Sequence, residues 1–123
     1  MEALKQGTKM KMSNAIDGSR GKEFNVTVLC KEFTLPDEVF DSPDSALDRE
    51  LYEKLVFVKI EDAPDYLGGD IHLAACDNKG NWTFDPTFWE CVGDDIKYYE
   101  KALAEAGYKA QWNKKGYFDI VSK

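Results

Sequence analysis

The segment from Gly68 to Glu90 constrains the fold of this chain most strongly, because its pattern is that of two strands joined by a tight turn. Apolar Ile71, Leu73 and Ala75 alternate with the residues between them, and a period of two predicts a strand with one face in a core. Residues 77–80 contain the Asp, Asn and Gly that tolerate left-handed backbone in tight turns. Residues 81–84 favour a returning strand, which Pro86 ends because it has no N–H to donate.

The same alternation predicts further strands on both sides of this hairpin. Residues 8–13 and 24–30 alternate polar and apolar side chains and predict a first hairpin. Residues 55–60 are nearly all apolar, which is typical of a central strand covered on both faces. Residues 61–69 form an acidic connection that ends in Gly68 and Gly69. Residues 108–112 and 117–121 predict a closing hairpin around the turn chemistry of residues 113–116.

Two longer helices are expected between the strands. Ser42 and Pro43 carry start signals, and leucines follow at a spacing of four, which predicts an amphipathic helix over residues 43–54. Asp94 and Asp95 open a second helix over residues 94–106, and Gly107 is placed to end it. Residues 36–40 predict a single helical turn.

These elements predict one α+β domain over residues 1–123, in the order ββ-α-βββ-α-ββ. We expect an antiparallel or mixed sheet of about seven strands in hairpins, with the two helices packed on it. The lysines of the first hairpin are interpreted as charges that protect an edge strand. Edge strands at both termini would also permit a homo-oligomer.

Composition limits the class of protein and its setting. An apolar fraction of 43% argues against disorder. No stretch approaches 18 apolar residues, and the first six residues lack the apolar region of a signal peptide, so we expect no membrane partner. Cys30, Cys76 and Cys91 are odd in number and widely spaced, which favours free buried thiols in a reducing compartment. We therefore expect a cytoplasmic protein.

The negative charge is concentrated in the middle of the chain. The net charge is −7, yet residues 34–100 alone hold 17 acidic and 5 basic side chains. Direct nucleic-acid binding is disfavoured, because phosphate contacts need clustered basic residues and Arg20 and Arg49 are the only arginines. The segment indicates either attraction to a basic partner or a merely solvated surface.

The titratable residues do not form a recognisable catalytic or metal-binding motif. Cys30, His72, Cys76 and Cys91 are the only soft zinc ligands, and His72 and Cys76 lie about 13 Å apart if both belong to one strand. No pair of cysteines has the C-x2-C spacing of zinc sites. A Cys–His nucleophile would have to use the single histidine. We expect no metal and no cofactor.

Three functions remain, of which the first is favoured. The first is a non-enzymatic acidic interaction protein, such as an inhibitor or immunity-type protein, that binds a basic, nucleic-acid-handling protein partner. Trp89 would anchor it, and the acids that steer the partner would be Asp37, Glu38, Asp41, Asp44, Asp48, Asp94 and Asp95. The alternative is a small-ligand-binding or sequestering domain with an aromatic-lined pocket formed by Trp82, Trp89, Tyr98 and His72. The third is a small carboxylate-dependent enzyme that uses Asp70, Asp77 and Asp85.

Overall fold

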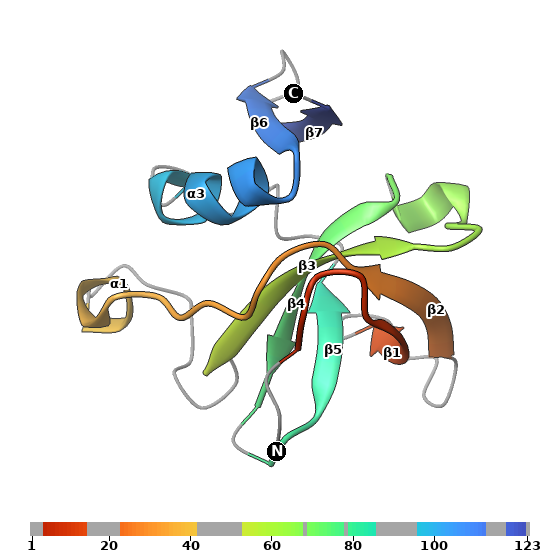
Figure 1. Ribbon diagram of the computed structural model, residues 1–123, viewed down its shortest axis with the longest axis horizontal. Coiled ribbons are helices and arrows are strands. Elements are labelled where there is room, and N and C mark those ends of the chain that lie inside the picture. Colours follow the sequence, from red (N-terminus) through yellow and green to blue (C-terminus); the bar gives the residue numbers. More distant parts are fainter. Residues whose placement is uncertain are drawn as a thin grey trace.

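The strands of the protein form a closed barrel and a separate two-stranded sheet, as seen in the computed structural model (Figure 1). The structure describes residues 4–14, 23–41, 53–67, 69–77, 79–85, 96–112 and 118–122. The barrel strands are β1 (Lys9–Asn14), β2 (Glu23–Val28), β3 (Lys54–Ile60), β4 (Ile71–Cys76) and β5 (Trp82–Asp85). The second sheet consists of β6 (Tyr108–Trp112) and β7 (Phe118–Ser122). The helices are α1 (Asp37–Asp41), the 3-10 turn η1 (Asp65–Leu67) and α3 (Lys97–Glu105).

The α+β class and the mixed pairing are confirmed, but the expectation of one sheet is wrong. Neighbouring barrel strands pair antiparallel in chain order, and β1 closes the barrel by pairing parallel with β5. The closing contacts join Ser13 to Thr83 and Asn14 to Phe84. Local alternation does not reveal this pairing, because it joins segments about seventy residues apart in the chain. Closure also corrects the edge-strand interpretation at the end of β1, where Ser13 and Asn14 have a neighbour on each side.

All three predicted hairpins are confirmed. β1 pairs with β2, β4 with β5, and β6 with β7, each in antiparallel register. At the turn between β4 and β5, the Asp77 carboxylate accepts hydrogen bonds from the backbone N–H of Lys79 at 2.9 Å and of Asn81 at 3.0 Å. Gly80 takes a φ of 85°, which glycine adopts without a steric penalty. Turn chemistry therefore fixes this hairpin locally.

Strand β4 is buried on both faces, whereas the sequence predicted burial on one. All six of its residues are buried. Register and alternation place His72 and Ala74 in the barrel interior, in line with Val58 on β3 and Phe84 on β5. The opposite face of β4 lies outside the barrel wall. Its burial shows that the outer surface of the barrel is covered at β4.

Helix α3 covers the outer face of β3. Its buried Tyr99 lies with its ring centroid 6.3 Å from that of Phe57 and 6.1 Å from that of Phe33. Leu103, one turn further, is also fully buried. Gly107 ends the helix with a φ of 88°, as its sequence position predicted. α3 and the β6–β7 sheet lie together on one side of the barrel (Figure 1).

The remaining helix predictions have different outcomes. The turn at residues 36–40 is confirmed as α1. The predicted helix over residues 43–54 falls mostly outside the described residues. Lys54 departs from that prediction, because it is the first residue of β3. Within the part of the chain that the structure describes, no helix is long and apolar enough to cross a membrane.

Candidate functional site

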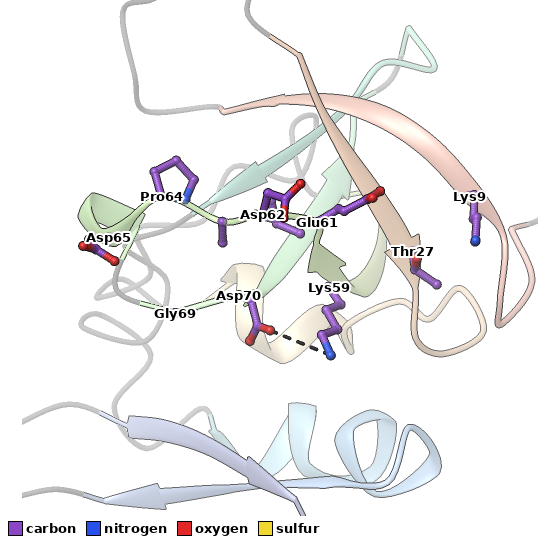
Figure 2. A pocket seen from close by; sticks show the side chains of 11 residues that line it. Lys9, Thr27, Lys59, Glu61, Asp62, Pro64, Asp65, Gly69 and Asp70 are labelled. Atoms are coloured by element: carbon purple, nitrogen blue, oxygen red, sulfur yellow. Dashed lines mark ion pairs between the residues drawn. The ribbon is translucent and has the colours of Figure 1, made fainter.

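A surface pocket of about 740 Å³ lies where the β3–β4 connection meets the outer wall of the barrel (Figure 2). We call it the β3–β4 pocket. Its lining comes from β1, β2, the end of β3 and the connection that follows. The lining residues are Lys9, Thr27, Lys59, Ile60, Glu61, Asp62, Ala63, Pro64, Asp65, Gly69 and Asp70.

The barrel wall provides one side of the pocket as a cross-strand row. Lys9 pairs with Thr27, and Thr27 pairs with Lys59, so the three residues lie abreast on adjacent strands. Their neighbours Met10, Val26 and Ile60 occupy the alternate, inward positions. Because paired residues on one face lie about 5 Å apart, the two lysines stand roughly 10 Å apart with a threonine between them. The row is fixed by barrel register.

The β3–β4 connection provides the acidic side of the pocket. Glu61, Asp62 and Asp65 come from this segment, and Asp70 ends it. The backbone N–H of Ile60 donates to the Asp70 carbonyl at 2.7 Å, and that of Glu61 donates to the Asn25 carbonyl at 2.8 Å. These bonds tie both ends of the connection to the barrel.

Asp62 takes a left-handed backbone conformation within this connection. Its φ is 52°, in the region that Asp and Asn adopt more readily than other residues with a side chain. The backbone there turns sharply, directly after Glu61 has bonded to the barrel. The left-handed residue and the Glu61–Asn25 bond together set the course of the backbone on the acidic side of the pocket.

The pocket carries a net negative charge. Four carboxylates line it against two lysines. Lys59 Nζ lies 3.9 Å from Asp70 Oδ2, and the two side chains are 53% and 49% exposed. Figure 2 shows this pair on one flank, with Lys9 at one end of the pocket and Asp65 at the other. The excess of carboxylates therefore favours a cationic group in the pocket over an anionic one.

His72 lies behind the pocket, inside the barrel. Its Nε2 is 2.8 Å from the carbonyl oxygen of Gly69, a residue that lines the pocket. Burial lowers the pKa of His72 below its ordinary value of 6.5, although the Gly69 hydrogen bond and the charges of Asp70 and Asp85 act in the opposite direction. The imidazole is therefore neutral near pH 7.

The acids predicted to steer a partner are only partly within the described residues. Asp37 and Glu38 lie in the first turn of α1, and Asp41 is its last residue. The Tyr98 hydroxyl donates to Glu38 Oε1 at 2.7 Å and so joins α3 to α1. α1 and η1 lie on opposite sides of the barrel (Figure 1), so the α1 acids do not contribute to the β3–β4 pocket. Outside the described residues lie Asp44, Asp48, Trp89, Asp94 and Asp95.

Of the predicted aromatic pocket, the three residues that the structure describes are not gathered in one place. His72 is inside the barrel, Trp82 is opposite Cys76 at the far end of the β4–β5 pair, and Tyr98 bonds to Glu38. None of these three lines the β3–β4 pocket. Of the residues that line it, the sequence suggested only Asp70 as a site residue. The signal available was the acidic connection itself, whereas the Lys9–Thr27–Lys59 row requires the strand register.

The three carboxylates suggested for an enzyme lie at two ends of one hairpin. Asp70 precedes β4 and Asp77 follows it, so about 23 Å of extended strand separates them. Asp77 accepts two backbone hydrogen bonds and one from the Asn81 side chain, which lower its pKa and give it a structural role in the turn. Asp85 lies opposite Leu73, at the Asp70 end. The three carboxylates therefore do not lie in one site, because Asp77 is at the opposite end of the hairpin from Asp70 and Asp85.

The cysteines in the described part of the chain are free and buried. Cys30 and Cys76 form no disulfide, and burial is the main cause that raises the pKa of each thiol. Cys30 Sγ accepts a hydrogen bond from the Phe57 backbone N–H at 3.4 Å, which suits a structural role. Among the residues that the structure describes, no three His, Cys, Asp or Glu side chains are grouped so that they could hold a metal ion.

Comparison with known proteins gives no further guide to this site. No protein-family model, no curated protein sequence and no solved structure matches the chain.

Proposed function

We propose that this protein is a non-enzymatic acidic interaction protein that binds a basic protein partner in the cytoplasm. An inhibitor or immunity-type protein that blocks a nucleic-acid-handling enzyme is the concrete form of this proposal. The observation that carries it is the β3–β4 pocket, whose four carboxylates outnumber its two lysines. Lys or Arg side chains of the partner would lie along the acidic connection that carries Glu61, Asp62 and Asp65.

The pocket supports this function better than α1 does. Hydrogen bonds to the barrel hold both ends of the acidic connection, so the backbone that carries its carboxylates is positioned before the partner arrives. Ordering in advance reduces the entropy lost on binding. Helix α1 is only five residues long, and Glu38 already accepts a hydrogen bond from Tyr98. We therefore assign partner recognition to the pocket and long-range steering to the acidic chain as a whole.

Charge attraction sets the expected salt dependence. Attraction between exposed charges is screened beyond about 8 Å at physiological ionic strength, so salt slows association more than it changes packing contacts. Lys59 and Asp70 neutralise each other at one flank. The unbalanced acids are then Glu61, Asp62 and Asp65, with Lys9 at the far end of the pocket.

The test is affinity capture from source-cell lysate at low and high salt, with bound proteins identified by mass spectrometry. One variant combines Glu61→Gln, Asp62→Asn and Asp65→Asn, where the asparagine at position 62 preserves tolerance of the left-handed backbone. The matched control combines Asp37→Asn and Glu38→Gln on α1. We expect a basic protein that the wild type and the α1 control retain at low salt and that the pocket variant loses. Equal capture by all three proteins would contradict the proposal.

A second candidate function is binding of a small charged ligand in the same pocket. Its volume of about 740 Å³ falls within the roughly 300–1,000 Å³ of ligand sites. The lining residues suit a ligand with a cationic and an anionic end, the latter near Lys9 and Thr27. A bound ligand raises the melting temperature with its concentration. A metabolite panel that leaves the melting temperature unchanged would remove this candidate.

A further inference from the structure

His72 is the buried polar side chain among the described residues, and it is the only histidine of the chain. It is 1% exposed. Register places it in the barrel interior, opposite Val58 on β3. Its ring centroid lies 6.0 Å from that of Phe84 on β5. An ionisable group in such apolar surroundings is expensive to charge.

The hydrogen bonding of His72 fixes its protonation state. The Gly69 carbonyl can only accept, so Nε2 carries the proton and donates across 2.8 Å. Nδ1 is then the bare nitrogen, and it is buried without a hydrogen-bond partner among the described residues. Protonation would place an N–H at Nδ1 with no acceptor, in addition to a positive charge. The closed barrel therefore favours the neutral Nε2–H tautomer.

The groups around His72 have opposing effects on the pKa of its ring. Asp70 precedes β4 and Asp85 ends β5, and both favour the protonated ring. Val58 and Phe84, which face it from β3 and β5, carry no charge. Burial outweighs the two carboxylates, and the pKa falls. Asp70 stands at the pocket, so it attracts a protonated ring outward.

The hydrogen bond of His72 is also a mechanical link to the pocket. Gly69 has a φ of 141°, which residues with a side chain rarely adopt. The next residue, Asp70, accepts the Ile60 N–H through its carbonyl and pairs with Lys59 through its carboxylate. The His72–Gly69 bond thus adds to the Ile60–Asp70 bond and to buried Leu67 in holding this end of the connection, and its loss would loosen that end.

We propose that His72 is a pH-sensitive latch of the β3–β4 pocket. Neutral His72 holds Gly69 and keeps the acidic connection closed on the barrel. Protonation leaves Nε2–H a donor to Gly69, but it puts a positive charge and an unpaired Nδ1–H into the apolar interior. To escape that burial the ring moves out toward Asp70, and only this movement gives up the bond to Gly69 and opens the connection. The inference that acid releases the partner rests on the proposed function; the latch itself does not.

The direction and limit of the effect follow from proton linkage. The open form leaves His72 near its ordinary pKa of 6.5, whereas the closed form lowers it. Opening is therefore unaffected well above pH 6.5 and becomes more frequent as the pH falls below it. One proton is taken up, so the opening equilibrium changes at most tenfold per pH unit.

The test uses the isotope-labelled full chain without a partner, between pH 7.5 and 5.5. Because the chain has a single histidine, its ring signals in NMR are unambiguous. We expect an Nε2–H tautomer and a pKa below 6.5. We also expect protection of the Ile60 amide to fall up to tenfold per pH unit below 6.5. The Leu55 amide, which donates to Phe33 at the other end of β3, is the control and should keep its protection.

Two variants separate a latch from a merely structural histidine. The glutamine introduced by His72→Gln has an N–H that can donate to Gly69 and does not titrate, so Ile60 protection should become independent of pH. Asp70→Asn removes a carboxylate that favours the charged ring, so the transition should move to lower pH. A wild-type His72 pKa at or above 6.5, or Ile60 protection that stays constant across the range, would overturn the proposal even if His72→Gln fails to fold.

The same proteins distinguish this inference from the proposed function. If the connection opens in acid but no basic partner is captured, the latch is supported and the proposed binding function is rejected. Capture that depends on the pocket acids but is equally strong at pH 7.5 and 5.5 would support binding and reject the latch.

Discussion

The barrel and the C-terminal region differ in how their strands are completed. Each barrel strand pairs with two neighbours, and the interior is filled by buried side chains from all five strands. In the described residues, β6 and β7 pair only with each other; β6 packs mainly on α3, and Tyr108, Ala110 and Ile120 are packed against the hydrophobic core. A two-stranded hairpin is marginally stable alone. The hairpin therefore depends on the docking of α3, whereas the barrel depends on its own closure.

Large apolar side chains also differ in exposure between the barrel and the C-terminal region. Trp112 at the end of β6 is 59% exposed, whereas Phe57, Phe84 and Leu73 in the barrel are fully buried. Local opening is most frequent where few apolar contacts are buried. We expect amide exchange to be fastest in β6 and β7 and slowest in β3 and β4. The difference teaches that the pocket stands on the part of the chain with the more completely buried side chains.

The largest expected effect is on the barrel. Phe84→Ala removes a fully buried ring that packs edge-on against Phe24, with centroids 5.5 Å apart. Truncating a buried Phe costs about 3–5 kcal/mol of unfolding free energy. Urea denaturation followed by tryptophan fluorescence would measure the loss. A loss below about 1 kcal/mol would show that closure, and not interior packing, stabilises the barrel.

Leu103→Ala should separate the two regions. Leu103 is a fully buried residue of α3, and such truncations cost about 2–5 kcal/mol. We expect amide protection to fall in β6 and β7 and to remain in β4, because α3 links the hairpin to the barrel. Hydrogen exchange read by NMR gives both values. An equal loss in β4 would mean that the two regions unfold as one unit.

Gly107→Ala tests the junction between α3 and β6. Gly107 has a φ of 88°, and a Cβ placed there would meet no atom within 4 Å. The penalty is therefore backbone strain alone, about 1–2 kcal/mol. Thermal denaturation would measure it, with Gly107→Asn as the control, since Asn tolerates this conformation better. An equal loss for both variants would point to a cause other than the backbone angle.

The pH dependence of stability tests the barrel interior. The folded-state pKa of His72 is lowered from 6.5, so well above pH 6.5 neither state is protonated and the effect is absent. As the pH falls below 6.5, the unfolded chain binds the proton first, and stability decreases by at most about 1.4 kcal/mol per pH unit. Denaturation at pH 7.5, 6.5 and 5.5 measures the slope. His72→Gln should flatten it, and a slope that persists in this variant would assign the effect to other groups.

Lys59→Met should have the smallest effect. The Lys59–Asp70 pair spans 3.9 Å with both side chains about half exposed, and such pairs contribute about 0–1 kcal/mol. Methionine retains most of the apolar stem. We expect a shift in urea midpoint near the limit of detection, and a weaker dependence of stability on salt. A loss above about 2 kcal/mol would mean that the pair holds the β3–β4 connection more firmly than its exposure indicates.

Local features were predictable because neighbouring residues decide them. The alternation over Phe24, Val26 and Val28 predicted a buried strand face, and all three side chains are buried in β2. Turn chemistry at Asp77 and Gly80 fixed the β4–β5 hairpin. Gly107 marked the end of α3 because few other residues accept its backbone angle. These predictions depend on contacts within a few residues of each position.

Nonlocal features were missed for the converse reason. The sequence placed the first hairpin at an edge, because nothing near Ser13 or Asn14 indicates a partner on β5. It assigned one buried face to β4, because only the packing of other segments covers the outer wall. It also chose Tyr98 and His72 for one pocket, although one bonds to Glu38 and the other lies inside the barrel.

The sequence by itself determined the strands, the turns, the C-terminal helix and the acidic β3–β4 connection of this protein. Only the tertiary structure decided that five strands close into a barrel, that Lys9, Thr27 and Lys59 stand abreast, and that His72 reaches Gly69 from the interior. The physical reason is the distance along the chain over which each interaction acts. Backbone preference and hydrophobic period act within a strand or turn, whereas register and closure are set by contacts between distant segments.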